Sequence, residues 1–426
     1  MSYEEENRQA LISYFQKGAK GSLSSRALGV EVEHFVVHID TLQSVPYEAH
    51  AGEVGVSDVL AYLAQFYPEK TWGLQGDLIG LASHEASITL EPAAQLEISI
   101  APYESIAEIV RIYQAFRDRV DPFLAQRGCM LVAQGYHPSQ KAHDLQLIPK
   151  QRYRFMDEYF TNIHTHGERM MRASASTQVS VDFADETDAV RKMRITQAFA
   201  PVLAAMTDNV SAFEGDTNTQ PIERLNLWRH VDNARCGSVP GLFDEGYGFA
   251  AYADWLLRTC PIFVTRPSVH DPEGPSLRGV FGQTAQEAYA DAPMTDQDRE
   301  HLISMFWPDV RLKTFVEIRP ADSLPLDLAA GYAALIKGLY YSESSLTALE
   351  QALGVVDGVW PLDDQSTDSV IEAIRTNRAQ AYFYGRTLVE WEDFLLETAR
   401  AALSEEDRSF LEALTNHVIK LRKDHE

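Results

Sequence analysis

Cysteine is scarce in this sequence. Only three of its 426 residues are cysteines (Cys129, Cys236 and Cys260), and no two of them form a Cys-X-X-Cys motif. Few, widely spaced cysteines argue against a disulfide scaffold and against a structural zinc site, and they are typical of proteins in a reduced cytoplasm. We therefore expect a cytoplasmic protein that is not held together by disulfides.

Several other features are missing. No run of about 18 apolar residues occurs, so the sequence predicts no transmembrane helix. Segment 1–20 has no apolar core, which argues against a signal peptide. Neither a Gly-X-X-X-X-Gly-Lys-Ser/Thr motif nor a Gly-X-Gly-X-X-Gly motif after a strand is present. These absences argue against P-loop and Rossmann nucleotide sites.

Basic residues are outnumbered by acidic ones. Lys and Arg together number 37 against 62 Asp and Glu, which gives a formal net charge of −25. Such a surface repels nucleic acids and anionic membranes, so we expect small-molecule partners and neither of those two. Two interpretations of this negative charge are open. Most of it serves solubility, and some of the acids converge to hold cations.

The sequence contains enough apolar residues for a large core, at 45% of the chain. Helical and extended patterns alternate irregularly, and the extended segments are not the continuous apolar runs of a parallel sheet. This arrangement predicts an α+β fold with a mainly antiparallel sheet. Ser105 and Glu108 predict the start of an amphipathic helix that ends at Gly128. From about Leu326 onward the pattern is helical, so we expect a helical C-terminal region.

Polar and apolar residues alternate in four extended segments. Successive side chains of a strand point to opposite faces, so the polar residues of each segment share one face. That face carries acids, amides and arginine. The segments are Gly29–Phe35, Gln95–Ile100, Gln178–Asp182 and Phe315–Arg319.

Two interpretations fit these segments. One is an ordinary antiparallel sheet with one face in water. However, the four segments contain no lysine, and carboxylates brought side by side repel each other unless cations neutralise them. With a rise of about 3.3 Å per residue, Glu31 and Glu33 are expected about 6.5 Å apart. That spacing suits ligands of magnesium ions, and Arg319 beside Glu317 suits a phosphate that the metal bridges.

A longer series of motifs contains these segments. It consists of Gly29–Glu33, Gln75–Asp77, Ile88–Glu97, Ile148–Tyr153, Met170–Met171, Ser174–Asp182, Arg224, Leu227–Trp228, Arg235 and Phe315–Arg319. In this order the series resembles the plant- and proteobacterial-type glutamate–cysteine ligases, a family that includes the actinobacterial ligase of the ergothioneine pathway. The resemblance extends from about Gly29 to Ser342.

The resemblance implies a glutamine-synthetase-like catalytic fold, in which a curved antiparallel sheet with flanking helices forms the wall of the active site. It implies a catalytic part in residues 1–345, with the helical region 346–426 packed on the same unit. The implied reaction uses ATP and Mg²⁺: the γ-carboxylate of glutamate is phosphorylated, and the amine of cysteine then displaces phosphate. The product is γ-glutamylcysteine, a precursor of glutathione or a related thiol.

Residue roles also follow from the resemblance. Arg319 and Lys150 are implied contacts of ATP. Arg319 and Arg235 are implied catalytic residues. Contacts with substrate are implied for Arg224, Arg235 and Ser176. A magnesium shell is implied for Glu31, Glu33, Glu91, Glu97, Gln178 and Glu317.

One departure and three alternatives accompany the resemblance. The family's Glu-Pro-Gly-Gly-Gln reads Glu91-Pro-Ala-Ala-Gln95 here, and alanine alters the turn if glycine serves a positive φ angle. This change bears on the substrate preference more than on the ATP chemistry. The alternatives are a γ-glutamyl ligase with another amine acceptor, a carboxylate-pair hydrolase such as a glycosidase, and a non-catalytic homologue that binds amino acids.

Overall fold

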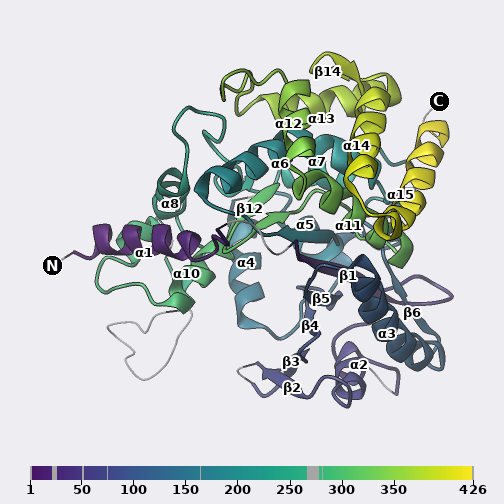
Figure 1. Cartoon of the computed structure of the whole chain (residues 1–426). Helices are drawn as coiled ribbons and strands as arrows, with labels where there is room; N and C mark the ends of the chain where they lie inside the picture. The colour runs from purple at the N-terminus through teal and green to yellow at the C-terminus, as the bar shows by residue number, and fades with distance from the viewer. Residues whose placement is uncertain are drawn as a thin grey trace.

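The computed structural model describes residues 2–21, 26–49, 52–73, 75–163, 165–265, 278–280 and 282–424. It confirms the predicted α+β class: one large antiparallel sheet lies at the centre, and helices pack against it (Figure 1). The two ends of the chain lie on opposite sides of the molecule, beside α1 (Glu4–Gln16) and α15 (Glu405–Asp424). Within the described residues, no helix is both long and apolar enough to cross a membrane.

The four segments of alternating polarity form neighbouring strands. In sheet order they are β13 (Val316–Ile318), β7 (Thr177–Val181), β1 (Leu28–His38) and β5 (Leu96–Tyr103). The sheet continues beyond β5 with β4 (Ala86–Leu90), β3 (Leu78–Ala82) and β2 (Glu69–Trp72), and beyond β13 with β12 (Val310–Leu312). β6 (Cys129–Val132) pairs with the end of β1. These pairings are antiparallel, as the sequence predicts.

The register brings the predicted polar residues together. On β1, Glu33 lies opposite Glu97 of β5, and Glu31 lies opposite Gln178 of β7. Residues directly opposite each other in an antiparallel pair share a face. The carboxylates of β1 and β5 therefore converge on one face of the sheet, and the alternating apolar residues, such as Val32, are buried on the other.

The helices that pack on the sheet include α2 (Val56–Leu63) on β3, α3 (Ile106–Ala125) on β5 and β6, α6 (Glu186–Met206) on β12 and β13, and α11 (Leu326–Tyr340) on β1 and β7. The predicted start of α3 is confirmed, because Ser105 Oγ accepts a hydrogen bond from the Glu108 backbone N–H at 3.3 Å. These helices supply the partner for the apolar face of the sheet.

Shorter segments frame the polar face. They are α4 (Gln151–Asn162), α5 (Gly167–Ala173), α7 (Glu223–Trp228), the end of α10 (Asp296–Ile303) and β11 (Trp307–Pro308). The remaining elements before α11 are η1 (Ala142–Asp144), β8 (Cys236–Gly237), α8 (Phe249–Arg258), β9 (Phe263–Val264), β10 (Arg278–Gly279) and α9 (Ala285–Ala288).

The C-terminal region is helical, as predicted. α11 is followed by α12 (Glu343–Ala352), α13 (Ser366–Asn377), η2 (Arg378–Gln380), the hairpin β14 (Tyr382–Phe383) and β15 (Arg386–Thr387), α14 (Leu388–Ala402) and α15. α14 and α15 pack on α11, and α13 packs on α6, so this region covers the helices that cover the sheet (Figure 1). The division into residues 1–345 and 346–426 stays a prediction.

Candidate active site

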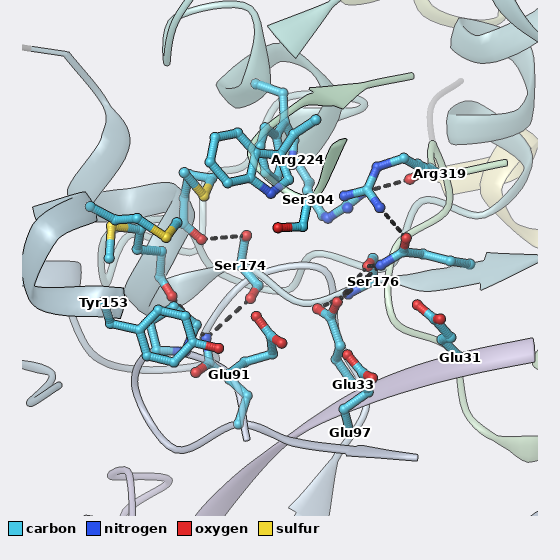
Figure 2. A pocket seen from close by; sticks show the side chains of 18 of the residues that line it. Glu31, Glu33, Glu91, Glu97, Tyr153, Ser174, Ser176, Arg224, Ser304 and Arg319 are labelled. Atoms are coloured by element: carbon cyan, nitrogen blue, oxygen red, sulfur yellow. Dashed lines mark hydrogen bonds between the residues drawn. The ribbon is translucent and has the colours of Figure 1, made fainter. Parts of the chain in front are cut away.

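A cavity of about 370 Å³ lies over the polar face of the sheet. Figure 2 shows Glu31, Glu33, Glu91 and Glu97 on one side of it, with Arg224 and Arg319 across from them. β1, β5 and the β4–β5 turn supply the acids, whereas α7 and the end of β13 supply the arginines. The predicted site residues that line the cavity are Glu31, Glu33, Glu91, Glu97, Lys150, Ser176, Gln178, Arg224 and Arg319.

Neighbouring polar side chains hold the acids in place. Glu33 accepts hydrogen bonds from the backbone N–H of Ser176 at 2.7 Å and from Ser176 Oγ at 2.9 Å. Its Oε1 also accepts one from Gln178 Nε2 at 3.2 Å. Glu97 Oε1 accepts from Ser99 Oγ at 2.6 Å and from Thr89 Oγ1 at 3.0 Å. The two carboxylates are therefore oriented by the protein itself.

Burial and mutual repulsion outweigh the positive charge near the acids. Burial, followed by repulsion from Glu97 and Glu317, raises the pKa of Glu31 to about 7. Burial, followed by repulsion from Glu91 and Glu97, raises the pKa of Glu33 to about 8. The pKa values of Glu91 and Glu97 are raised too, first by burial. An added cation would relieve this repulsion.

The donors fit a hard cation by their chemistry, since carboxylate and amide oxygens are its usual ligands. In the described part of the chain, however, no three His, Cys, Asp or Glu side chains gather closely enough to hold a metal ion as they stand. Each acid has its own hydrogen-bonding partners or opposing charges instead.

Glu317 stands apart from the other acids. It does not line the cavity, and it is fully buried. Its Oε1 accepts from Lys313 at 2.8 Å, and its Oε2 accepts from Arg311 at 2.7 Å and Arg319 at 2.8 Å. Although burial opposes ionisation, these three cations hold the pKa of Glu317 well below its usual value. Glu317 thus fixes Arg311 and Arg319 at the edge of the cavity.

Replacing Glu317 with alanine is expected to lower the free energy of unfolding by about 3 kcal/mol, because buried arginines lose their counter-charge. Urea unfolding of the metal-free protein measures this. Glu343→Ala is the matched control: its carboxylate also lies 2.7 Å from an arginine, Arg191, but is 77% exposed. That variant should lose at most about 1 kcal/mol. Equal losses in the two variants would contradict the role given to Glu317.

Arg235 lies elsewhere. Its side chain is buried and does not line the cavity. Arg235 Nε donates to Asp232 at 2.6 Å, and Nη2 donates to the Cys260 carbonyl at 2.6 Å and to Tyr159 Oη at 3.2 Å. These contacts join the loop that carries Asp232 and Arg235 to α4 and to the segment around Cys260. The geometry therefore gives no support to the predicted catalytic and substrate-binding roles of Arg235.

Arg224 is the substrate-binding candidate that does reach the cavity. Its Nη1 donates to the carbonyls of Pro320 and Ala321, each at 3.2 Å, and of Arg319 at 3.4 Å. Three backbone acceptors thus fix one end of the guanidinium. The backbone of the chain just after β13 thereby couples the positions of Arg224 and Arg319.

Several cavity residues were missed by the sequence reasoning. Arg152 donates from Nη1 to Ser304 Oγ and from Nη2 to the Ser304 carbonyl, both at 2.8 Å. Arg311 lies on β12, where Val310 and Leu312 show the same two-residue alternation, so this signal was available. Arg152 belongs to Ile148–Tyr153, one of the motifs that carry the family resemblance. Ser304 follows a helix end and carries no such signal.

The alanine pair in the Glu91–Gln95 turn has a visible consequence. Ala94 has a φ angle of +66°, in the left-handed region that glycine adopts at little cost. Its N–H donates to the Glu91 carbonyl at 3.0 Å. The turn thus keeps a conformation suited to glycine even with alanine in place.

The sequence matches known proteins. A model of glutamate-cysteine ligase family 2 (GCS2) matches residues 27–420. Curated relatives include glutamate–cysteine ligase B, chloroplastic, of Oryza sativa subsp. japonica, 30% identical over 343 residues that cover 80% of this chain and 68% of that protein. The chloroplastic glutamate–cysteine ligase of Nicotiana tabacum is 31% identical over 342 residues, covering 80% and 64%.

Among solved structures, the glutamate–cysteine ligase of Francisella tularensis in complex with AMP aligns with 93% of this chain and 82% of its own, at 12% identity and a TM-score of 0.49. The glutamine-synthetase-like character of the fold stays a prediction, whereas its mixed helical and antiparallel-sheet class is observed. The match to the family model spans the sheet, the cavity and the C-terminal helices. The chain belongs to glutamate–cysteine ligase family 2.

Proposed function

We propose that the chain catalyses the ATP- and Mg²⁺-dependent ligation of the γ-carboxyl of L-glutamate to the amine of L-cysteine, giving γ-glutamylcysteine for glutathione or a related thiol. One observation carries this proposal: a single cavity is lined by a set of acids and an opposing set of arginines. Family membership agrees with it. We assign the reaction to a reduced cytoplasm because all three cysteines are free, whereas the plant relatives above are chloroplastic.

Magnesium suits the acid side of the cavity. Mg²⁺ takes oxygen ligands and is usually held by one or two carboxylates together with substrate phosphates. When bound, it would neutralise negative charge on the phosphates of ATP. The ligands proposed for it are Glu31, Glu33, Glu91 and Glu97. The amide oxygen of Gln178 is proposed as a further ligand, which would exchange its hydrogen bond from Arg319 for the ion. Glu317 is proposed as the anchor of Arg319, because both of its oxygens are engaged by cations.

The reaction consists of two group transfers. A γ-carboxylate oxygen of glutamate forms a bond to the terminal phosphorus of ATP while the bond to the ADP oxygen breaks. The ammonium of the acceptor first loses one proton to solvent. The neutral amine then forms a bond to the acyl carbon while the bond from that carbon to the phosphate oxygen breaks, and the second proton that nitrogen loses leaves with the phosphate. Neither step requires a nucleophilic side chain, so the protein contributes mainly position and charge.

The arginines divide this work. Arg319 is held at the cavity edge and would stabilise the negative charge on the transferred phosphoryl group. Arg224 has one nitrogen fixed on backbone carbonyls, which leaves the rest of its guanidinium to pair with the α-carboxylate of glutamate. Lys150 lines the cavity near Glu91 and is proposed to contact ATP phosphates.

The identity of the amine acceptor is proposed from apolar residues of the cavity, because the charged residues are assigned to ATP, Mg²⁺ and glutamate. Met156, Met170, Met171, Trp228 and Trp307 line the same cavity. Thioethers and aromatic rings suit a thiol or another short, soft side chain. This lining favours cysteine, and it also keeps open a second candidate function, γ-glutamyl ligation of another amine with a small apolar side chain.

ADP release should require glutamate, Mg²⁺ and an amine together, and mass spectrometry should find γ-glutamylcysteine when cysteine is supplied. α-Aminobutyrate, which replaces the thiol by a methyl group, tests the contribution of the sulfur. Serine and glycine serve as matched polar and truncated acceptors. Faster turnover with an amine other than cysteine would reassign the acceptor. ADP release that does not depend on glutamate would overturn the ligase proposal.

A further inference from the structure

The side chain of Gln95 joins two parts of the cavity wall. It is 2% exposed. Gln95 Nε2 donates to the backbone carbonyls of Met171 at 3.3 Å, Arg172 at 3.1 Å and Ser174 at 3.3 Å. Its Oε1 accepts from the backbone N–H of Ala93 at 2.8 Å. A primary amide carries both a hydrogen-bond donor and an acceptor, whereas an apolar side chain carries neither and an ionised carboxylate only accepts.

On one side of Gln95 lies the turn that carries Glu91. The Glu91 N–H donates to the Gln95 carbonyl at 2.9 Å, which closes the turn. Ala94 within it has a φ of +66°, a conformation that persists in a non-glycine residue when surrounding contacts impose it. The hydrogen bond from Ala93 to Gln95 Oε1 is one such contact. Gln95 therefore holds the turn in the shape that directs Glu91 into the cavity.

On the other side lies the segment from Met171 to Ser174, which leads to Ser176, the residue just before β7. Ser176 holds both oxygens of Glu33 with its N–H and hydroxyl. The amide of Gln95 thus links the segment that orients Glu33 to the turn that carries Glu91. The two acids belong to different parts of the chain and repel each other, so their separation depends on such a link.

We propose that Gln95 is a positioning residue of the metal site, which fixes Glu91 relative to Glu33 by bridging the 91–95 turn and the 171–174 segment. This inference rests on the proposed function, since it takes the two carboxylates as magnesium ligands. Mg²⁺ requires near-octahedral geometry at about 2.0–2.1 Å. A small displacement of one carboxylate therefore weakens binding even when every ligand is still present.

Gln95→Met keeps the length of the side chain and removes all four hydrogen bonds. We expect its affinity for Mn²⁺, measured by the electron paramagnetic resonance signal of the free ion, to fall about 10-fold or more. The Mg²⁺ concentration for half-maximal turnover should rise by a similar factor, with a smaller change in the KM for glutamate. Gln95→Glu keeps the acceptor for the Ala93 N–H but loses the donor to the three carbonyls, so its Mn²⁺ affinity should also fall. This variant replaces Gln95→Met in the test if Gln95→Met does not fold.

Gln197 offers a matched control. It is fully buried and does not line the cavity. Its Nε2 donates to Ser238, Asp309 and Thr367, and its Oε1 accepts from the Val239 N–H at 3.1 Å. Gln197→Met should lower the melting temperature with an unchanged Mn²⁺ affinity. A purely structural Gln95 would behave in the same way, and that result would overturn the proposal.

A double-mutant cycle tests whether Gln95 acts through Glu91. Glu91→Gln alone should weaken Mn²⁺ binding, and adding Gln95→Met should then have a smaller effect than in the wild type. Full additivity would contradict the proposed route. Wild-type protein that binds no Mn²⁺ and shows no Mg²⁺-dependent turnover would instead overturn the proposed function. If the wild type binds Mn²⁺ and shows Mg²⁺-dependent turnover, and Gln95→Met binds Mn²⁺ with the same affinity, the role proposed for Gln95 is wrong and the proposed function stands.

Discussion

Replacing Arg319 with alanine is expected to lower kcat by about 10³-fold, with little change in the KM for glutamate. Arg319 lines the cavity, and its Nη1 donates to Glu317 and to Gln178. The guanidinium is therefore held in place before substrates bind. Charge on the transferred phosphoryl group develops during the reaction, so a fixed cation acts mainly on the transition state and its loss appears in kcat.

Steady-state ADP release at saturating ATP, glutamate and cysteine measures this effect. Arg319→Lys keeps the charge without the planar fork and should lose less activity than the alanine variant. Arg191→Ala controls for the loss of a partly buried, paired guanidinium elsewhere. Arg191 lies on α6, pairs with Glu343 and Glu350, and does not line the cavity. A higher KM at unchanged kcat for Arg319→Ala would mean that the residue binds the ground state and the transition state equally, which would contradict this role.

The face on which each acid lies could be predicted from the sequence, because two-residue alternation is a local property of a strand. Glu31 and Glu33 share a face whatever the neighbouring strands are. The pairing of Glu33 with Glu97 could not be predicted in this way. Register depends on long-range pairing between strands, and a shift by one residue would bring Leu96 or Ile98 opposite Glu33 instead.

The roles of the arginines were harder to predict for a related reason. Arg235 and Arg224 lie in segments with no strand alternation, so only the folded chain separates the arginine that reaches the cavity from the one that pairs with Asp232. Glu317 alternates correctly, yet Arg311 across the hairpin and Lys313 occupy its carboxylate. Alternation predicts the face on which a charged residue lies. It does not predict whether that residue binds a ligand in the cavity or pairs with an opposite charge of the protein.

The metal-free protein is expected to lose stability as the pH rises from about 5 to 8, and Mg²⁺ should reverse part of this loss. The pKa values of Glu31 and Glu33 are about 7 and about 8 in the folded state, above the ordinary 4.5. Between these values the folded state binds more protons than the unfolded state, so the free energy of unfolding falls as the pH rises. Bound Mg²⁺ favours the ionised carboxylates and so opposes the fall.

Urea unfolding at several pH values, with a chelator and with Mg²⁺, measures this dependence. Asp208 and Glu392, outside the cavity, also have raised pKa values, of about 8 and about 7. Part of the pH dependence is therefore independent of the metal, and the part that Mg²⁺ reverses is the one assigned to the cavity. If Mg²⁺ has the same effect on stability at pH 5 and pH 8, the assignment of these acids as its ligands is wrong.

Glu31→Ala should separate stability from function at this site. Removing Glu31 relieves repulsion with Glu97 and Glu317, so the metal-free variant should be at least as stable as the wild type at pH 8. Its pH dependence should be shallower, and turnover should fall by at least about 10³-fold because a metal ligand is lost. Glu343→Ala, an exposed carboxylate, should change neither property. Because Glu317→Ala is expected to lose stability, the opposite outcomes of the two variants distinguish an acid that awaits a cation from one that already has its partners.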